Sequence, residues 1–171
     1  MTVLEQTGLR VRVRGIVQGV GFRPFVYALA VHHHLNGWVL NTSGGVEIEI
    51  SGATADIQAF CHRLQNNPPP LARIDEILTE PMPLNGAVGF VILESQPQPG
   101  EFIPISPDMA ICPDCRRELF DPSDRRYRYP FINCTNCGPR FTIIKDIPYD
   151  RPKTTMSPFP MCVDCESEYH N

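Results

Sequence analysis

A short stretch near the N-terminus has the composition of an anion-binding loop. Residues 15–23 read Gly-Ile-Val-Gln-Gly-Val-Gly-Phe-Arg, with three glycines among the first seven positions. Glycine lets backbone N–H groups approach an oxyanion without interference from side chains. We expect a helix to begin where this stretch ends, and its N-terminus would add partial positive charge. Arg23 would add a planar, permanently charged guanidinium group suited to phosphate.

Paired cysteines in the C-terminal half form a second candidate site. Cys112 and Cys115 are followed, after 18 residues, by Cys134 and Cys137. Two residues between cysteines let one tight turn aim both thiolates at one ion, and the second pair completes a tetrahedron. The spacing predicts a structural zinc site, with iron–sulfur ligation as the less favoured alternative. Five nearby arginines would partly offset the charge of four thiolates on one zinc ion: Arg116, Arg117, Arg125, Arg126 and Arg140.

A third pair, Cys162 and Cys165, has no fourth pair after it before Asn171. His170 is one candidate for a further ligand. The favoured interpretation is that a second four-cysteine site needs cysteines beyond residue 171, so that the chain is a fragment or a truncated product. We then expect about one tightly bound zinc ion per chain, and little independent order after about Pro148.

Composition limits the possible functions of the chain. Its 171 residues are 42% hydrophobic, which supports a core, and 15 basic residues face 19 acidic ones, a net charge of −4. This balance argues against a nucleic-acid binder, which needs a positive surface. The sequence has no long apolar run and no secretory signal at its start, so we expect a cytoplasmic protein without a membrane span. Without export, paired cysteines indicate metal rather than disulfides.

Residue patterns predict the elements that would position the glycine loop. Residues 9–15 alternate apolar side chains with arginines, which indicates a strand with one buried and one solvated face. Helical spacing then runs from Phe22 to about His33, with Pro24 in the first turn. The expected elements that follow are strands 37–41 and 46–50 joined by a turn, a helix at about 53–65, strand 74–79 with an irregularity at Asp75-Glu76, and strand 88–93.

This order of elements predicts a fold class and a division of the chain. A β-α-β-β-α-β order with an extra strand is the split-βαβ, ferredoxin-like arrangement, an α+β fold. Both helices would cover one face of the sheet and the arginines of the first strand would lie on the other. We expect this domain over residues 1–95, a linker over 96–110 and a loop-rich zinc-binding region over 111–171, which shows little helical or strand periodicity.

Two motifs give the N-terminal domain a specific family resemblance. Gly15 and the run from Val17 to Arg23 closely resemble the acylphosphatase signature. Residues 37–41 (Gly-Trp-Val-Leu-Asn) and 44–47 (Gly-Gly-Val-Glu) resemble the second acylphosphatase motif. With the strand order, the resemblance covers residues 8–95. An acylphosphatase domain followed by Cys-x-x-Cys pairs is similar to the N-terminal part of the HypF family, the carbamoyltransferases of [NiFe]-hydrogenase maturation.

The resemblance implies a reaction and roles for particular residues. The first domain of that family hydrolyses carbamoyl phosphate to carbamate and phosphate. Arg23 would hold the phosphoryl oxygens, and Asn41 would orient the attacking water through its amide. The backbone N–H groups that would share the phosphoryl group belong to Val17, Gln18, Gly19, Val20, Gly21 and Phe22. The step would need no metal; zinc would be structural, with the ligands Cys112, Cys115, Cys134, Cys137, Cys162 and Cys165.

The resemblance also implies partners, and two other functions remain in competition. In the family, YrdC-like and Kae-like domains use ATP to pass the carbamoyl group to the protein HypE; those domains are absent from this sequence, which could perform only the first step. One alternative is a phosphate-binding and zinc-dependent protein-docking module without catalysis. Another is a zinc-dependent nucleic-acid binder, which the acidic balance disfavours.

Overall fold

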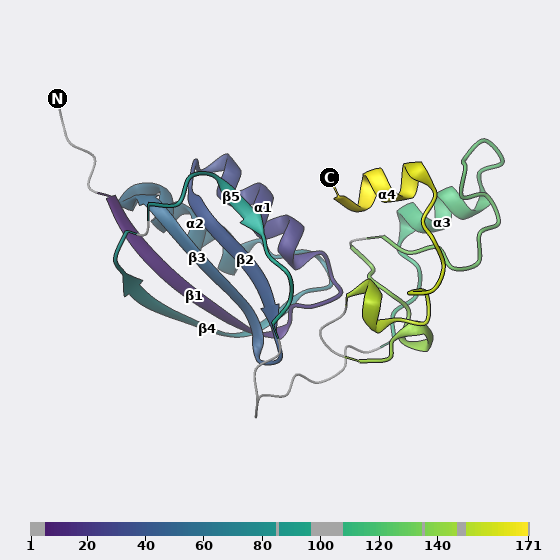
Figure 1. The fold of residues 1–171 in the computed structure, drawn as a ribbon, viewed down its shortest axis with the longest axis horizontal. Helices are drawn as coiled ribbons and strands as arrows, with labels where there is room; N and C mark the ends of the chain where they lie inside the picture. Colours follow the sequence, from purple (N-terminus) through teal and green to yellow (C-terminus); the bar gives the residue numbers. More distant parts are fainter. Residues whose placement is uncertain (1–5, 85, 97–107, 135, 147–149, 171) are drawn as a thin grey trace.

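A five-stranded sheet with two helices on one face forms the N-terminal half of the chain (Figure 1). The computed structural model describes residues 6–84, 86–96, 108–134, 136–146 and 150–170. The elements of this half are β1 (Gln6–Ile16), α1 (Phe22–His32), β2 (Asn36–Thr42), β3 (Gly45–Ala53), α2 (Thr54–Asn66), β4 (Arg73–Met82) and β5 (Phe90–Ile92). The strand order is β4-β1-β3-β2-β5, with β2 and β5 parallel and the other neighbours antiparallel. The predicted α+β, ferredoxin-like arrangement is confirmed.

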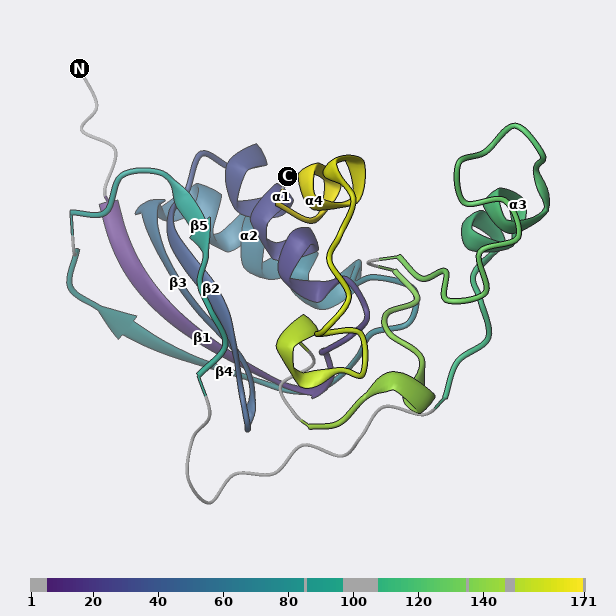
Figure 2. The same ribbon diagram turned by 45° about the vertical axis from the view of Figure 1, so that its right-hand side comes forward.

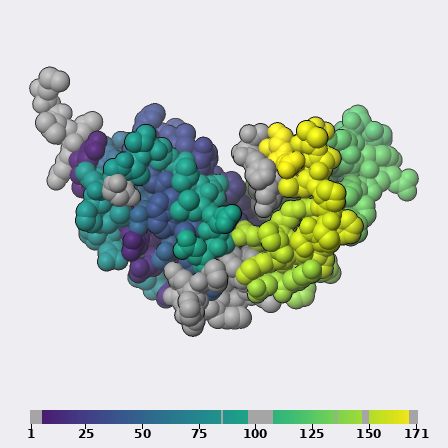
Figure 3. Space-filling view, viewed as in Figure 1, coloured from purple at the N-terminus to yellow at the C-terminus, as the bar shows by residue number. Residues whose placement is uncertain are grey.

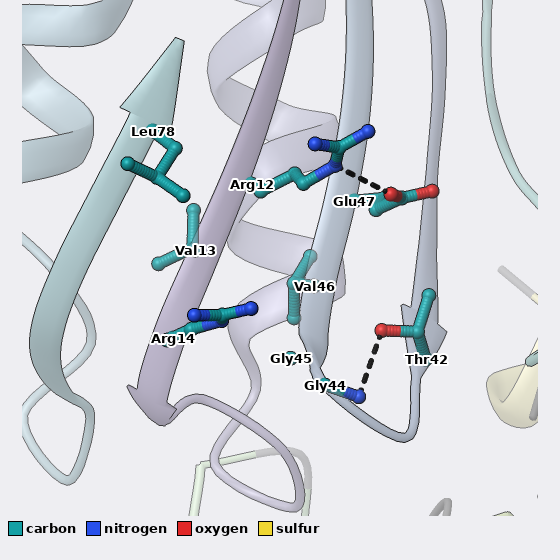
Figure 4. Close-up of a pocket in the computed structure, with 9 residues that line it drawn as sticks. All are labelled: Arg12, Val13, Arg14, Thr42, Gly44, Gly45, Val46, Glu47 and Leu78. Carbon is teal, nitrogen blue, oxygen red and sulfur yellow. Dashed lines mark hydrogen bonds and ion pairs between the residues drawn. The ribbon is translucent and has the colours of Figure 1, made fainter. Parts of the chain in front are cut away.

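The alternation of apolar and arginine side chains along β1 gives the sheet one buried face and one solvent-exposed face, as the sequence predicts. Val11 and Val13 are fully buried beneath α1 and α2, which cover the same side of the sheet (Figure 2). The arginines point to the opposite face, where Arg12 Nε donates to Glu47 on β3 at 2.9 Å. Figure 4 shows this pair on the open face, where both side chains help to line a pocket that extends to the turn between β2 and β3. Arg10 pairs with Glu49, and Arg14 with Glu76.

Two details of the outer strands were only partly predicted. The register of β1 against β4 shifts so that Arg14 faces Glu76 while Gly15 faces Ile74, which leaves Asp75 as a bulge residue, as expected. Strand β5 is shorter than the predicted 88–93. It begins only after Gly89, which has a φ of +79° and is therefore outside the extended region.

The C-terminal half contains more helix than the sequence pattern suggested. Helices α3 (Pro113–Phe120) and α4 (Val163–His170) each begin within a Cys-x-x-Cys pair, and two 3-10 turns, η1 (Phe141–Ile143) and η2 (Arg151–Lys153), lie between them. The region is loop-rich, as predicted, and the sequence shows little helical period because these two helices are short. Local capping starts α3 instead: the Cys112 sulfur accepts from the Cys115 amide at 3.5 Å, and Pro113 occupies the first turn.

The tail is also more ordered than expected. Residues 150–170 contain η2 and α4, and Thr154 forms an antiparallel bridge with Ile144. The Thr155 amide donates to the Ile143 carbonyl at 2.7 Å. Backbone pairing with an earlier segment therefore supplies order that the incomplete cysteine pair alone would not. Residues 97–107 of the expected linker, and Pro148, lie outside the described residues. Among the helices that the structure describes, none is long and apolar enough to cross a membrane.

Candidate active site and metal centre

The glycine loop connects β1 to α1 and turns sharply through two glycines. Gly19 and Gly21 have φ values of +70° and +74°, a region that side-chain-bearing residues rarely adopt. Gly21 caps α1, and its carbonyl accepts from the Phe25 amide at 3.1 Å. The helix therefore begins at Phe22, as predicted, and its N-terminal N–H groups lie beside the loop. This is the local structure that anion binding requires.

Gln18 fixes the loop to the neighbouring hairpin, a role that the sequence did not reveal. Its side chain is only 2% exposed. Its Nε2 donates to the Thr42 carbonyl at 2.7 Å and to the Gly45 carbonyl at 2.8 Å, at the turn between β2 and β3. The loop is therefore tied to the residue next to Asn41. A polar glutamine among glycines and valines indicated that Gln18 could have a structural role, but the sequence did not show which carbonyls it binds.

The structure brings the two predicted catalytic residues together. Asn41 lies near the end of β2 and is 2% exposed, while Arg23 lies in the first turn of α1. The orientation of the Asn41 amide follows from its neighbours. With its oxygen toward Arg23, that oxygen accepts from Nε at 3.2 Å and from Nη2 at 3.3 Å. The amide nitrogen is then on the branch away from the guanidinium group.

Arg23 has two further partners that the sequence did not indicate. Its Nη1 donates to the Ser95 hydroxyl at 3.3 Å, and its Nη2 donates to the Asp150 carboxylate at 2.7 Å. Asp150 lies 127 positions away in the sequence, between Cys137 and Cys162. No sequence pattern around Asp150 marks it as a site residue. The candidate active site therefore receives side chains from both halves of the chain.

We expect Gln18→Ala to destabilise the domain and weaken any activity of the loop. The substitution leaves two buried carbonyls, of Thr42 and Gly45, without the donor that now binds them, so the free energy of unfolding should fall by about 2–3 kcal/mol. Urea unfolding followed by fluorescence measures this. Gln65→Ala, at an exposed position of α2, is the matched control and should change little; equal effects of the two substitutions would contradict the proposed tether.

Four cysteines form a cluster with the geometry of a zinc site. The sulfurs of Cys112, Cys115, Cys134 and Cys137 all lie within 4.8 Å of one another. The Cys112–Cys134, Cys115–Cys137 and Cys134–Cys137 sulfur distances are 3.6, 3.7 and 3.7 Å. Tetrahedral zinc with Zn–S bonds of about 2.3 Å requires sulfurs about 3.8 Å apart. The donor set and its spacing therefore fit a closed, structural zinc ion, with no position open for substrate.

The thiols in this cluster differ in acidity. Burial, followed by the neighbouring thiols, raises the pKa of Cys115. Burial also opposes ionisation of Cys137, but backbone amides and Arg140 outweigh it and lower the pKa of Cys137 to about 7. Arg140 Nη2 donates to the Cys137 sulfur at 2.8 Å. A divalent cation is what would allow all four thiols to ionise together.

The third cysteine pair does not join the cluster. Cys162 and Cys165 lie beside Arg125, whose Nη1 is 3.3 Å from the Cys165 sulfur and 3.9 Å from the Cys162 sulfur. Within the described parts of the chain, the four-cysteine cluster is the one group of three or more metal-binding side chains. The side chain of His170 lies outside the described residues. Of the five arginines expected near the thiolates, Arg125 and Arg140 contact sulfur, whereas Arg117 and Arg126 pair with carboxylates.

The cysteine region packs directly against the glycine loop. A Cβ atom added to Gly138 would lie 1.6 Å from the Gly19 carbonyl oxygen, so only glycine permits this approach. Gly138 directly follows the buried Cys137. Leu71 packs against both the sheet core and the cysteine cluster. Figure 3 shows the C-terminal region, in green and yellow, lying beside the sheet domain. The zinc-type site and the anion loop are therefore neighbours.

Comparison with known proteins gives two family matches along the chain. The family described as Acylphosphatase matches residues 9–92, and the family described as HypF finger matches residues 111–144. The carbamoyltransferase HypF2 of Cupriavidus necator is 54% identical over 156 residues, which are 90% of this chain and 19% of that protein. The chain belongs to the HypF family.

The remaining comparisons agree with this membership. A crystal structure of full-length HypF in the phosphate- and nucleotide-bound form matches with a TM-score of 0.93 and 53% identity, covering 99% of this chain and 22% of that one. An acylphosphatase of Leuconostoc mesenteroides is 39% identical over 85 residues, 49% of this chain and 94% of that protein. The chain thus spans about a fifth of the length of the HypF relatives. The finger match contains the four clustered cysteines and ends before Cys162.

Proposed function

We propose that this chain hydrolyses an acyl phosphate, with carbamoyl phosphate as the physiological substrate, to carbamate and phosphate. The observation that carries the proposal is the pairing of Arg23 with the buried Asn41 at 3.2–3.3 Å, beside the glycine loop of an acylphosphatase domain. A relative crystallised in a phosphate- and nucleotide-bound form supports a phosphate site within this family.

The loop and Arg23 would hold the phosphoryl group. The N–H groups of residues 17–22 and the N-terminus of α1 would bind its oxygens, and Arg23 would neutralise their charge through parallel N–H donors. These donors are fixed in place before the substrate arrives, because Gln18 ties the loop to the hairpin. Preorganised donors of this kind stabilise the transition state without reorganisation. This positive charge makes a metal unnecessary for the step.

Asn41 would orient the attacking water in line with the leaving group. An amide is not a strong base, so its contribution is positioning. The water oxygen bonds to phosphorus as the bond from phosphorus to the carbamoyl oxygen breaks, and carbamate leaves with the electron pair. One proton of the water passes to a phosphoryl oxygen. The products are carbamate and dihydrogen phosphate, which together carry the charge of the substrate dianion.

The wider role follows from the family. We place this hydrolysis as the first step of carbamoyl transfer to a HypE-like protein, for the cyanide ligands of [NiFe]-hydrogenase, in the cytoplasm. YrdC-like and Kae-like domains would perform the later steps. The four clustered cysteines would hold one structural zinc ion, and nucleic acid would not be a partner.

Asn41→Ala is expected to lower kcat for phosphate release by about 100-fold, with a smaller change in KM, because it removes water positioning rather than phosphoryl binding. Phosphate release from acetyl and carbamoyl phosphate measures this. Asn66→Ala, at the exposed end of α2, is the matched control and should retain full activity. A folded wild-type protein that releases no phosphate from either substrate would overturn the proposed activity.

The second candidate function is a phosphate-binding and docking module that does not catalyse. The contact that favours it is the Arg23–Asp150 ion pair, since a carboxylate already occupies the guanidinium group. Phosphate binding by the wild-type chain without hydrolysis, together with capture of a HypE-like protein in a pull-down, would support it.

A further inference from the structure

Asp150 belongs to the C-terminal region but reaches the candidate active site. Both family matches, which cover residues 9–92 and 111–144, leave it out. Its Oδ1 accepts from Arg23 Nη2 at 2.7 Å, and the two side chains are 25% and 23% exposed. The pair is therefore partly shielded from solvent, where an ion pair is stronger than on an open surface.

The segment that carries Asp150 is held in place by backbone contacts. The Asp150 carbonyl accepts from the Lys153 amide at 2.8 Å and so starts η2. Directly after η2, the Thr155 amide donates to the Ile143 carbonyl at 2.7 Å. The same region rests on the glycine loop through Gly138. The contact with Arg23 thus comes from a folded segment docked at the loop, not from an isolated surface side chain.

The guanidinium group of Arg23 presents two edges, and Asp150 lies on one of them. The Nε–Nη2 edge faces the Asn41 oxygen. The Nη1–Nη2 edge faces the Ser95 hydroxyl and the Asp150 carboxylate. A phosphoryl group binds a guanidinium group best through two parallel N–H donors on one edge. Such binding at the Nη1–Nη2 edge must displace Asp150, because the two anions need the same Nη2 donor and repel each other.

We propose that Asp150 is an additional residue of the anion site and competes with the phosphoryl group for Arg23. The inference rests on the proposed function only in taking Arg23 as the phosphoryl ligand. An anion binds only if it interacts with Arg23 more favourably than the Asp150 carboxylate does. The site therefore favours a phosphoryl dianion over singly charged anions. The same competition weakens the hold on inorganic phosphate and speeds its release. The region after the finger would thereby tune the acylphosphatase site.

The test is the affinity of the whole chain for inorganic phosphate, measured by isothermal titration calorimetry. Asp150→Asn keeps the shape of the side chain and removes its charge, and we expect it to bind phosphate about tenfold more tightly than wild type. Asp150→Ala should behave in the same way. Asp114→Asn makes the same change of net charge at an exposed ion pair with Arg117 on α3, and should leave the affinity within about twofold.

The outcomes separate this inference from the proposed hydrolysis. Tighter phosphate binding in both Asp150 variants supports competition, even if no variant releases phosphate from an acyl phosphate. Unchanged or weaker binding in both variants, with zinc content and unfolding midpoint as in wild type, overturns it and would make Asp150 a residue that merely holds Arg23. Equal tightening by Asp114→Asn would also overturn it, because the effect would then be one of net charge.

Discussion

Arg23→Ala should abolish nearly all hydrolysis, with a loss of about 1,000-fold in kcat/KM. Among the described residues, the Arg23 guanidinium group is the cation that contacts Asn41 beside the glycine loop. Its removal takes away the charge that binds the phosphoryl group and the partner that orients the Asn41 amide. It also leaves the Asp150 carboxylate beside the site without its cation, which adds repulsion. Phosphate release from acetyl phosphate, at substrate concentrations spanning the wild-type KM, measures the loss.

Arg12→Ala is the matched control for this variant. Arg12 lies on the open face of the sheet, paired with Glu47 and away from the loop (Figure 4), so full activity is expected. Arg12→Ala removes an exposed ion pair and should change the unfolding midpoint only slightly. Arg23→Ala removes a partly shielded ion pair and should lower the midpoint somewhat more. A folded Arg23→Ala protein with activity near that of Arg12→Ala would remove Arg23 from the mechanism.

Removal of zinc should release the C-terminal region while leaving the sheet domain folded. The cluster of Cys115, Cys137 and Ile132 is a very small core, so a bound ion would supply most of its stability. The sheet domain has a separate and much larger core beneath α1 and α2. We expect about one zinc ion per chain. Chelation or Cys137→Ser should make residues 108–170 sensitive to protease, as mapped by mass spectrometry, while the sheet domain resists cleavage.

Cys61→Ser is the matched control for the zinc experiment. Cys61 packs against the sheet core, and burial raises the pKa of its thiol, so it is not expected to bind metal. It should keep the full zinc content. Two zinc ions per chain would show that Cys162 and Cys165 find further ligands, from His170 or a second chain. A C-terminal region that stays protected after complete zinc removal would contradict a structural role for the ion.

Local patterns determined much of the fold because each depends on residues near in sequence. The alternation over residues 9–15 predicted β1 and its two faces, since successive strand side chains point to opposite sides. Spacing within Cys112–Cys115 and Cys134–Cys137 predicted the cluster for a similar reason: two intervening residues allow a shared ion. The short helices α3 and α4 were missed because one or two turns start from caps and are too brief for a period.

Some features of the glycine loop could be predicted from the sequence, and others depend on the tertiary structure. Its glycines and Arg23 were enough to predict an anion site, because φ freedom and side-chain charge are properties of the residues themselves. Two contacts could not be predicted from the sequence: the hydrogen bonds from Gln18 to the hairpin and the contact of Asp150 with Arg23. Both depend on which distant segments fold back onto the loop. The packing of Gly138 against Gly19, which no local pattern indicates, helps to place the C-terminal region at the site. A contact across 127 positions leaves no local pattern in the sequence.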